Sequence, residues 1–254
     1  MSAELRAIPV PGIGEVKAGD SIADTILAAL RRSRRKLVPG DILVVTHKVI
    51  SKAEGSIVSL DTIRPSRAAR LWARRYHRDA HVIELALSQS RRIVRKKNGV
   101  LITETCHGDY GFICANSGVD VSNVDGGNSA ALLPTDPDRS AQRLRRNIRL
   151  QTGVDIPVII TDSFGRPWRQ GLVEAAIGCS GLRVFRDCRG QCDPYGYKLQ
   201  VTQEAVADAL ASMAGLACGK LSRAPVCLIR GFSYQRGRGR GRDLIRPPAQ
   251  DLFR

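Results

Sequence analysis

Hydrophobic and polar positions follow two patterns along this chain: apolar residues at helical spacing, and short continuous apolar runs. Residues 20–36 carry an apolar stripe, in which Ile22, Ile26, Leu27 and Leu30 recur at helical spacing. Polar residues that can cap a helix stand directly before the stripe. This segment is therefore predicted to form an amphipathic helix.

Other segments are short apolar runs without helical spacing. Three of them, at 42–50, 155–162 and 224–232, predict buried strands. A strand-rich stretch covers 99–105 and 110–116, and the sequence His-Gly-Asp between them predicts a turn. The chain thus contains several strands at irregular intervals.

Four further segments are expected to be helices, at 65–77, 81–96, 135–153 and 203–219. A glycine-rich connection containing AIGCSGL is expected to lead to a polar, hairpin-like region at 187–202. Because helices and strands mix without a regular βαβ repeat, we expect an α+β fold with a mixed sheet rather than a doubly wound sheet.

The C-terminal segment has a different composition. RGRGRGR, at 236–242, is low complexity, and glycines between arginines bury too little apolar surface to become ordered by themselves. We therefore predict a main domain over 1–235 and an Arg/Gly-rich tail over 236–254. The apolar residues that could dock this tail are Leu244, Ile245, Leu252 and Phe253.

Composition narrows the function classes. The chain has 254 residues, 43% of them hydrophobic, and no apolar run approaches the roughly 18 residues of a membrane span. The N-terminus lacks a signal-peptide pattern, so we expect a cytoplasmic protein without a membrane partner. The net charge of +16 comes mainly from arginine and suits anionic partners, either nucleic acid or phosphorylated small molecules.

The seven cysteines do not form a metal-binding pattern. Cys188 and Cys192 are close in sequence, but no second pair stands nearby to complete a zinc site. Reduced, mostly structural thiols are expected.

Two stretches could bind phosphate. In VPGIGEVKAGD (10–20), Pro11, Gly12 and Gly14 favour a tight backbone with exposed amides, which is either an anion-binding nest or an ordinary turn. In THKVISKAEG (46–55), cationic side chains follow a predicted strand. They suit a triphosphate, or they are a solvated turn.

Two other stretches offer oxygen ligands. ANSGVDVSNV (115–124) supplies Asn116, Asp120 and Asn123, which suit Mg²⁺ or Mn²⁺ or form an Asx-rich turn. In VIITDSFGRPWRQG (158–171), Asp162 stands at the predicted strand end, where it could hold a metal or cap a turn. The arginines that follow could clamp a carboxylate or phosphate, or be solvated.

Several catalytic patterns are missing. The chain has four histidines, no metal-binding His pair and no G-x-S-x-G nucleophile elbow. The remaining chemistry is phosphate-centred, metal-assisted transfer.

These stretches together resemble one known family. PGIGEVKAGD, VVTHKVISKAEG, ANSGVDVSNV, LLPTDPDRSAQRLRRNI and VIITDSFGRPWRQG, in this order and spacing, are similar to the coenzyme F420-0:L-glutamate ligases, or F420 γ-glutamyl ligases. The similarity runs from about residue 8 to 232, and GRDLIRPPAQDLF resembles the tail of bacterial members. Some bacterial members carry a C-terminal flavin-binding domain, and we expect this chain to be the single-domain form.

The resemblance implies a GTP-dependent ligase. A carboxylate of coenzyme F420-0 would be activated as an acyl phosphate, and the amine of L-glutamate would displace the phosphate. Further glutamates could follow through γ-linkages. The implied cofactors are Mg²⁺ or Mn²⁺, with K⁺ as a further ion, and the family's own α+β fold forms a homodimer.

The resemblance also assigns residues. The nucleotide would contact Pro11, Gly12, Ile13, Gly14, His47, Lys48, Lys52, Asn123, Cys218, Gly219 and Lys220. Metal ions would be bound by Asp120, Asp162 and Ser163, the catalytic set would be Asp120, Asp162 and Arg166, and the substrate would contact Arg166, Trp168 and Arg169. Lys220 stands where archaeal members have an acidic residue, so either one metal ligand is missing or the lysine meets phosphate.

Two other functions fit parts of the sequence. A metal-dependent phosphohydrolase would use the same aspartates, and a basic nucleic-acid-binding protein would use the arginine-rich tail. The combined stretches favour the ligase, and a nucleic-acid partner is not expected.

Overall fold

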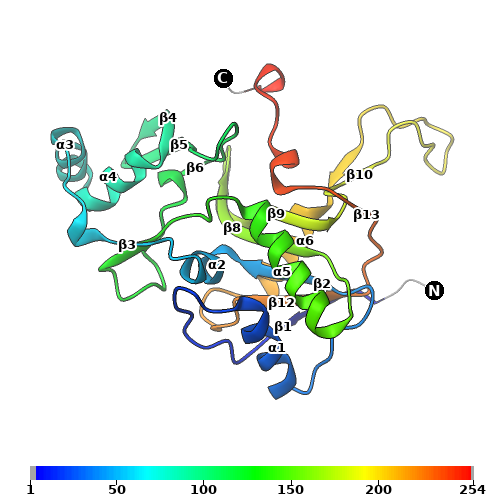
Figure 1. The fold of residues 1–254 in the computed structure, drawn as a ribbon. Coiled ribbons are helices and arrows are strands. Elements are labelled where there is room, and N and C mark those ends of the chain that lie inside the picture. Colours follow the sequence, from blue (N-terminus) through cyan, green and yellow to red (C-terminus); the bar gives the residue numbers. More distant parts are fainter. Residues whose placement is uncertain (1–3, 253–254) are drawn as a thin grey trace.

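Buried apolar runs form the middle of a six-stranded mixed sheet in the computed structural model, which describes residues 4–252 (Figure 1). The order is β1-β12-β2-β8-β9-β13, and β2 and β8 are the parallel neighbours. The strands span Arg6–Pro9 (β1), Ile42–Thr46 (β2), Val158–Arg166 (β8), Arg169–Leu182 (β9), Val226–Arg230 (β12) and Arg236–Gly237 (β13). The mixed sheet predicted from the sequence is confirmed.

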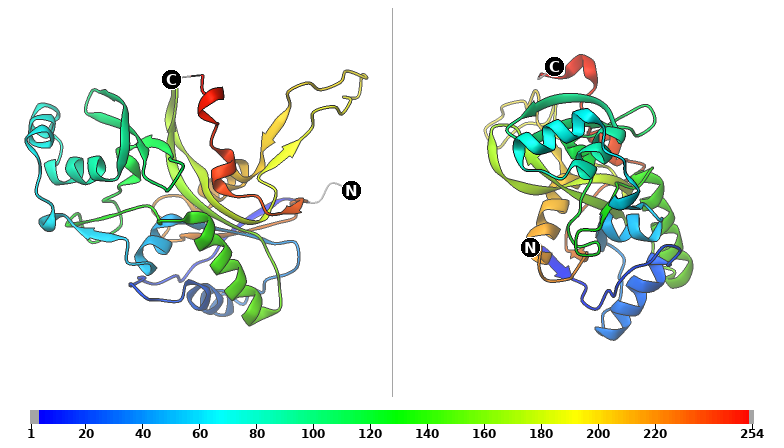
Figure 2. Two further views of the ribbon diagram at one scale, coloured as in Figure 1. Left: turned by 45° about the horizontal axis from the view of Figure 1, so that its top comes forward. Right: turned by 90° about the vertical axis from the view of Figure 1, so that its left-hand side faces the viewer.

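Helices cover both faces of this sheet (Figures 1 and 2). The covering helices are α1 (Ile22–Arg32) and α5 (Pro137–Thr152) on one face and α6 (Val206–Cys218) on the other. Along β2, Leu43 and Val45 join the core under α1 and α5, whereas Ile42 and Val44 join the core under α6. A strand buried on both faces explains the continuous apolar run in the sequence.

The predicted helices over 20–36 and 135–153 form, although the first ends early, at Arg32. The side chain of Ser21 accepts a hydrogen bond from the backbone N–H of Asp24 at the start of α1. Asp136 caps α5 through the N–H of Arg139, and Gly153 ends this helix at φ +72°, a left-handed conformation that glycine adopts readily.

A lobe stands to one side of the central sheet (Figures 1 and 2). It contains α3 (Arg67–Tyr76), α4 (Ala80–Ser88), β4 (Ser90–Lys97), β5 (Val100–Thr105) and β6 (Ile113–Ala115). The predicted helix over 81–96 is wrong in its second half, because it ends at Ser88 and becomes β4. Asn98 and Gly99 both adopt positive φ, which forms a tight hairpin turn and pairs β4 with β5.

Short elements complete the chain. They are α2 (His47–Ala53), β3 (Ile57–Ser59), β7 (Ser129–Ala131), β10 (Phe185–Asp187), β11 (Gln203–Ala205) and the 3₁₀ turns η1 (Leu60–Thr62), η2 (Asn116–Gly118), η3 (Gly241–Leu244) and η4 (Pro248–Gln250). The predicted strand over 42–50 ends early, since His47, Ile50 and Ser51 are buried at helical spacing. The expected polar hairpin at 187–202 is confirmed as an arm between β10 and β11 (Figure 1). Of the strand predicted over 110–116, only its end forms a strand, β6.

The strand predicted to end at residue 162 continues to Arg166 and turns back into β9. The segment AIGCSGL is therefore part of a long strand and not a connection. Its glycines serve close packing, because a Cβ on Gly178 would lie 2.4 Å from the carbonyl oxygen of Pro137 in α5. Asp162 consequently sits inside a hairpin, opposite Ala175, rather than at a strand end.

The Arg/Gly-rich segment packs against β9. Arg236 and Gly237 pair with it as β13. A Cβ on Gly241 would lie 2.3 Å from the carbonyl oxygen of Ile177, so the backbone approaches more closely than any side chain allows. The buried carboxylate of Asp138 accepts a hydrogen bond from the N–H of Gly241 at 2.6 Å. This segment therefore makes specific contacts with the main domain despite its low-complexity composition.

The predicted docking residues of the tail divide into three groups. Leu244 and Ile245 pack against the two core clusters that flank the central sheet. Leu252 is 75% exposed and does not dock, and Phe253 lies outside the described residues. Among residues 4–252, no helix has the length and apolar character that a membrane crossing demands.

Candidate functional site

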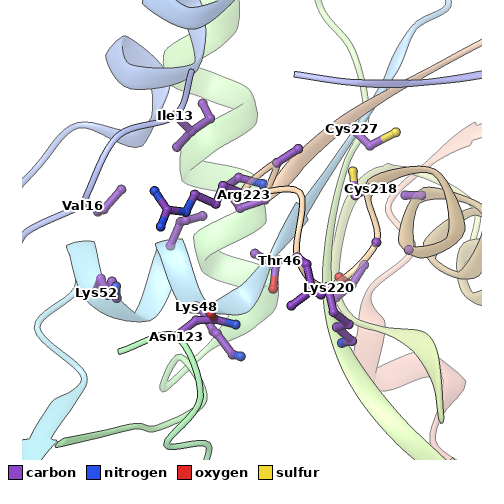
Figure 3. Close-up of a pocket in the computed structure, with 18 of the residues that line it drawn as sticks. Ile13, Val16, Thr46, Lys48, Lys52, Asn123, Cys218, Lys220, Arg223 and Cys227 are labelled. Atoms are coloured by element: carbon purple, nitrogen blue, oxygen red, sulfur yellow. The ribbon is translucent and has the colours of Figure 1, made fainter. Parts of the chain in front are cut away.

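A cavity of about 810 Å³ opens beside β2 (Figure 3). Three segments far apart in the sequence supply most of its wall: the loop after β1, helix α2, and the loop between α6 and β12. The cationic side chains in the wall are Lys48, Lys52, Lys220 and Arg223. The cavity therefore combines nucleotide-scale volume with positive charge.

Most of the predicted nucleotide residues meet at this cavity. Those that line it are Ile13, Gly14, Lys48, Lys52, Asn123, Cys218, Gly219 and Lys220. Pro11, Gly12 and His47 are outside the lining. Gly12 adopts φ +79°, and its carbonyl accepts a 2.6 Å hydrogen bond from the guanidinium of Arg32, which fixes the loop that carries Ile13.

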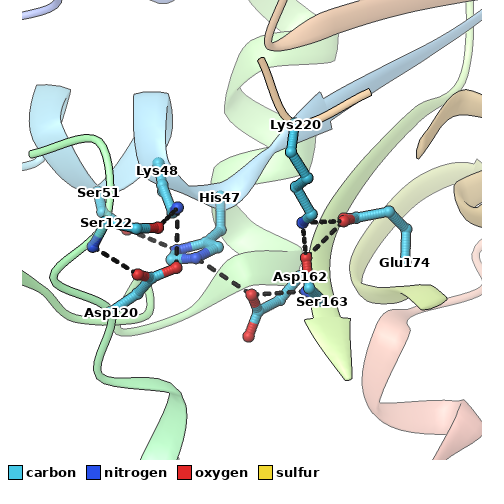
Figure 4. Close-up of polar contacts among 9 residues, drawn as sticks. All are labelled: His47, Lys48, Ser51, Asp120, Ser122, Asp162, Ser163, Glu174 and Lys220. Atoms are coloured by element: carbon cyan, nitrogen blue, oxygen red, sulfur yellow. Dashed lines mark hydrogen bonds and ion pairs between the residues drawn. The ribbon is translucent and has the colours of Figure 1, made fainter. Parts of the chain in front are cut away.

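The first acid–lysine pair is Asp120 with Lys48 (Figure 4). Lys48 Nζ lies 2.8 Å from Asp120 Oδ2 and donates a 2.8 Å hydrogen bond to Ser122 Oγ. The backbone of Asp120 is fixed by two hydrogen bonds with Ala131. Burial raises the pKa of Asp120, but the hydrogen bonds and charge supplied by Lys48 and Ser122 outweigh it, so the pKa falls below its ordinary value.

Asp162 lies next to the buried His47 (Figure 4). Asp162 Oδ1 accepts a 2.7 Å hydrogen bond from the N–H of Ser163, and His47 Nε2 lies 3.3 Å from the same oxygen. The other ring nitrogen of His47 is 3.2 Å from Ser51 Oγ within α2. His47 thus connects the start of α2 to β8 and supports Asp162 from behind the cavity wall.

The second acid–lysine pair is Glu174 with Lys220, and the sequence did not reveal its acid (Figure 4). Glu174 stands opposite Ser163 in the β8–β9 register. Its Oε1 accepts hydrogen bonds from Ser163 Oγ at 2.5 Å and Lys220 Nζ at 2.8 Å, and Lys220 also contacts Ser163. Gly215 on α6 leaves the necessary space, because a Cβ there would lie 2.3 Å from Glu174 Cγ.

Glu174 is ionised more easily than an ordinary glutamate. Burial raises its pKa, whereas hydrogen bonds from Lys220 and Ser163, together with the Lys220 charge, lower it further than burial raises it. The available sequence signal was a single acid among small and apolar residues. Its position opposite Ser163 follows only once the segment is known to be a strand.

Further cavity residues were also missed. Thr46 and Thr161 line it from the adjacent strands β2 and β8, Glu15 forms an ion pair with Lys52, and Arg223 lies in the loop after α6 at φ +54°. These residues belong to ordinary-looking strand and loop positions, so their types alone gave no indication of a shared site.

Arg166, Trp168 and Arg169 occupy the tip of the β8–β9 hairpin, away from the cavity lining. Arg166 donates a 2.8 Å hydrogen bond to the carbonyl of Gln170, which closes the turn. Trp168 is 82% exposed at φ +56°. Their assignment to substrate binding, and that of Arg166 to catalysis, stays a prediction.

Metal binding was assigned to Asp120, Asp162 and Ser163. Within residues 4–252, no three or more His, Cys, Asp or Glu side chains gather as a ready metal centre. None of the three lies in the cavity lining, but Asp120 pairs with the lining residue Lys48, and Asp162 directly follows the lining residue Thr161. Mg²⁺ is commonly held by one or two carboxylates plus substrate phosphates, so this donor set fits such an ion.

The chain was compared with known proteins. The family model described as F420-0:Gamma-glutamyl ligase matches residues 12–231. The coenzyme F420:L-glutamate ligase of Methanothermobacter thermautotrophicus is 42% identical over 253 residues, covering 98% of this chain and 99% of that protein. The protein of the same name from Methanopyrus kandleri is 43% identical over 255 residues, covering 98% of each.

A third relative, the coenzyme F420:L-glutamate ligase of Methanocaldococcus jannaschii, is 44% identical over 216 residues and 85% of each chain. The family match includes the loop after β1, helix α2, both acid–lysine pairs and the loop after α6. The chain therefore belongs to the F420-0:gamma-glutamyl ligase family of enzymes.

Proposed function

We propose that this protein joins L-glutamate to coenzyme F420-0, with GTP as the activating co-substrate. The γ-phosphate of GTP is transferred to a carboxylate of F420-0, giving an acyl phosphate. The amine of glutamate then attacks the acyl carbon, phosphate leaves, and an amide bond forms. Repetition at the γ-carboxylate of the product would add further glutamates.

The observation that carries this proposal is the convergence of four cationic side chains on one cavity in a member of this family. Lys48 and Lys52 come from one helix, and Lys220 and Arg223 from a loop more than 150 positions later. A triphosphate needs several such donors, and lysine binds phosphate as a mobile point charge. The loop containing Ile13 and Gly14 forms another part of the wall.

Each of the three lysines in the cavity wall forms an ion pair with an acid before any ligand binds. Lys48 is held by Asp120, Lys52 by Glu15, and Lys220 by Glu174. Each ammonium is thereby kept at the cavity wall before a ligand enters, which reduces the ordering cost of binding. A phosphate oxygen would then share the ammonium with the acid.

Asp120 and Asp162 are proposed to hold Mg²⁺ or Mn²⁺ together with the phosphates. The ion would neutralise charge that develops on the transferred phosphoryl group. Within the chain, Ser122 and Lys48 fix the Asp120 carboxylate, while Ser163 N–H and His47 orient Asp162. Ser163 offers a hydroxyl beside Asp162, and K⁺ is a further proposed ion.

The remaining substrates and the assembly are proposals from the family. Arg166, Trp168 and Arg169 would contact F420-0 or glutamate from the hairpin tip. A homodimer and a cytoplasmic location are also proposed, and analytical ultracentrifugation of the purified chain tests the dimer.

The decisive experiment is incubation of the protein with F420-0, GTP, L-glutamate and either Mg²⁺ or Mn²⁺, with and without K⁺, followed by mass spectrometry. A product heavier by one or more glutamyl residues, dependent on GTP, supports the ligase. Absence of glutamyl product with both metal ions would contradict it. Phosphate release from GTP without glutamate or F420-0 would instead support a phosphohydrolase.

A further inference from the structure

Two cysteine thiols meet in the wall of the cavity (Figure 3). Cys218 is the last residue of α6, and Cys227 lies in β12. Cys218 Sγ lies 3.7 Å from the carbonyl oxygen of Val226, the residue directly before Cys227, and both cysteines belong to the cavity lining. Figure 3 labels both side chains in this part of the wall. Neither thiol has a part in the proposed ligase chemistry.

The two thiols differ in reactivity. The neighbouring Cys227 thiol holds the pKa of Cys218 below its ordinary value, although burial and the nearby Glu174 charge act in the opposite direction. The Cys218 thiol and burial raise the pKa of Cys227. Cys218 is half-buried and Cys227 is 1% exposed, so a reagent in the cavity meets Cys218 as the more accessible and more nucleophilic thiol.

We propose that Cys218 and Cys227 form a redox-active dithiol, a modification site for low-molecular-weight disulfides that enter the cavity. The Cys218 thiolate attacks one sulfur of a disulfide RSSR, forming a mixed disulfide and releasing RS⁻, which takes a proton from water. Cys227 then gives its proton to water and attacks the Cys218 sulfur. The second RS⁻ leaves, so two protein thiols are oxidised and RSSR is reduced to two RSH.

The other cysteines make the pair distinctive. Cys114 and Cys179 are buried, and burial raises the pKa of both thiols. In contrast, Cys106 and Cys192 are exposed. Among the described residues, only Cys218 and Cys227 combine a thiol neighbour with a place in the cavity wall.

Oxidation would act on the cavity itself. A disulfide brings its sulfurs to about 2.05 Å, closer than two thiols that are not bonded can approach, and it would tie the end of α6 to β12. The segment between them, 219–226, carries Lys220 and Arg223. We expect the bond to displace this loop and weaken GTP binding, a consequence that rests on the proposed function, whereas the thiol chemistry does not.

The test uses the full chain with Cys106, Cys188 and Cys192 each changed to serine, so that the more accessible thiols outside the cavity are absent. The variant is treated with oxidised glutathione and analysed by peptide mass spectrometry. The expected result is a cross-linked Cys218–Cys227 peptide, lighter by two hydrogen atoms and restored by dithiothreitol. Cooperative thermal unfolding of the untreated variant checks its fold.

Two variants in this background separate the steps. With Cys227→Ser, the expected product is a persistent glutathione adduct on Cys218. With Cys218→Ser, Cys227 should stay unmodified over the same time. A persistent adduct on Cys218 while Cys227 is present, or equal labelling of Cys227 in the Cys218→Ser variant, would overturn the proposal. Cys218→Ala and Cys227→Ala provide the same comparison if a serine variant fails to fold.

GTP distinguishes this inference from the proposed function. If GTP occupies the cavity, saturating GTP with Mg²⁺ should slow cross-linking more than tenfold, and oxidation should weaken binding of GTP reversibly. Cross-linking that proceeds at the same rate with GTP supports the dithiol but counts against the nucleotide site. If the cysteines fail to cross-link while GTP still binds, the dithiol proposal is wrong and the nucleotide site is supported.

Discussion

Two of the three acid–lysine pairs at the cavity, Asp120–Lys48 and Glu174–Lys220, look alike in chemistry but differ in their support. Lys48 comes from helix α2 and its side chain is 19% exposed, whereas Lys220 comes from the loop after α6 and its side chain is 65% exposed. Their acids are more similarly sheltered, and both have lowered pKa values. The first pair is thus held on both sides, while the second has a fixed acid and a solvated lysine.

The difference in exposure between the two lysines suggests that the two pairs have different roles in ligand binding. An exposed ion pair contributes little stability because water screens it and the side chain loses entropy. A ligand can therefore take Lys220, which is mostly in water, more readily than Lys48, which is sheltered and also donates to Ser122. We infer that the first pair fixes the site and the second adjusts to the ligand.

The largest effect is expected for Asp120→Asn, which tests the role of the first pair. It preserves shape but removes the charge that Lys48 neutralises, and the proposed metal loses a ligand. We expect glutamyl ligation to fall on the order of 10²- to 10³-fold, as when a stabilising group is removed from a transition state. Steady-state kinetics measures this, and Ser122→Ala serves as the matched control with a smaller loss. Wild-type turnover of Asp120→Asn would show that the assignment is wrong.

The next variant is Glu174→Gln, which removes the acid from the second pair. Ser163 and Lys220 lose a charged acceptor in a largely buried place, and we expect unfolding free energy to fall by about 1–3 kcal/mol. Denaturant titration measures the change. Glu204→Gln provides the control, because Glu204 pairs with Arg186 on the solvent-exposed arm. Equal effects of the two variants would contradict a special role for Glu174.

Lys220→Ala should have a smaller effect on stability. Because the lysine is largely exposed, the unfolding free energy should change by no more than about 0.5 kcal/mol. The apparent KM for GTP should rise several-fold while kcat changes less, as expected for a phosphate contact made before and during reaction. Lys198→Ala, on the exposed arm, is the control for loss of one positive charge. An unchanged KM would remove Lys220 from the nucleotide site.

The smallest expected effect is the pH dependence of stability. Asp120 and Glu174 have folded-state pKa values below their ordinary values of 3.8 and 4.5, so each contributes stability that is present above those values. This contribution is lost as pH falls through the lowered folded-state pKa. Denaturant titrations from pH 6 to about pH 3 should show a shallower acid decline for Asp120→Asn and Glu174→Gln than for the wild type. Parallel curves would mean that neither pair is linked to acid stability.

Local patterns predicted much of the central domain. The caps at Ser21 and Asp136 and the left-handed Gly153 mark helix ends through contacts within a few residues, so they can be inferred without the fold. The turn at Asn98–Gly99 is equally local, and the incorrect helix over 81–96 came from overlooking it. That error was one of interpretation, since the turn signal is present in the sequence.

Other features depend on partners distant in sequence. Gly178 and Gly241 suggested a connection and a loose tail, but each is small because another backbone lies against it. Glu174 acquires its role from being opposite Ser163, and a strand shifted by one residue would turn it to the other face. Residue types alone do not encode these distances.

The family resemblance, the mixed sheet and most of the cationic residues at the cavity could be predicted from the sequence, because long motifs and apolar periods are properties of contiguous residues. The fold was needed to show which acid holds each lysine and which cysteines share the cavity wall. The physical reason is that α2, β9 and the loop after α6 reach one cavity through packing on opposite faces of the sheet. That packing brings Lys48, Glu174 and Lys220 within reach of one ligand.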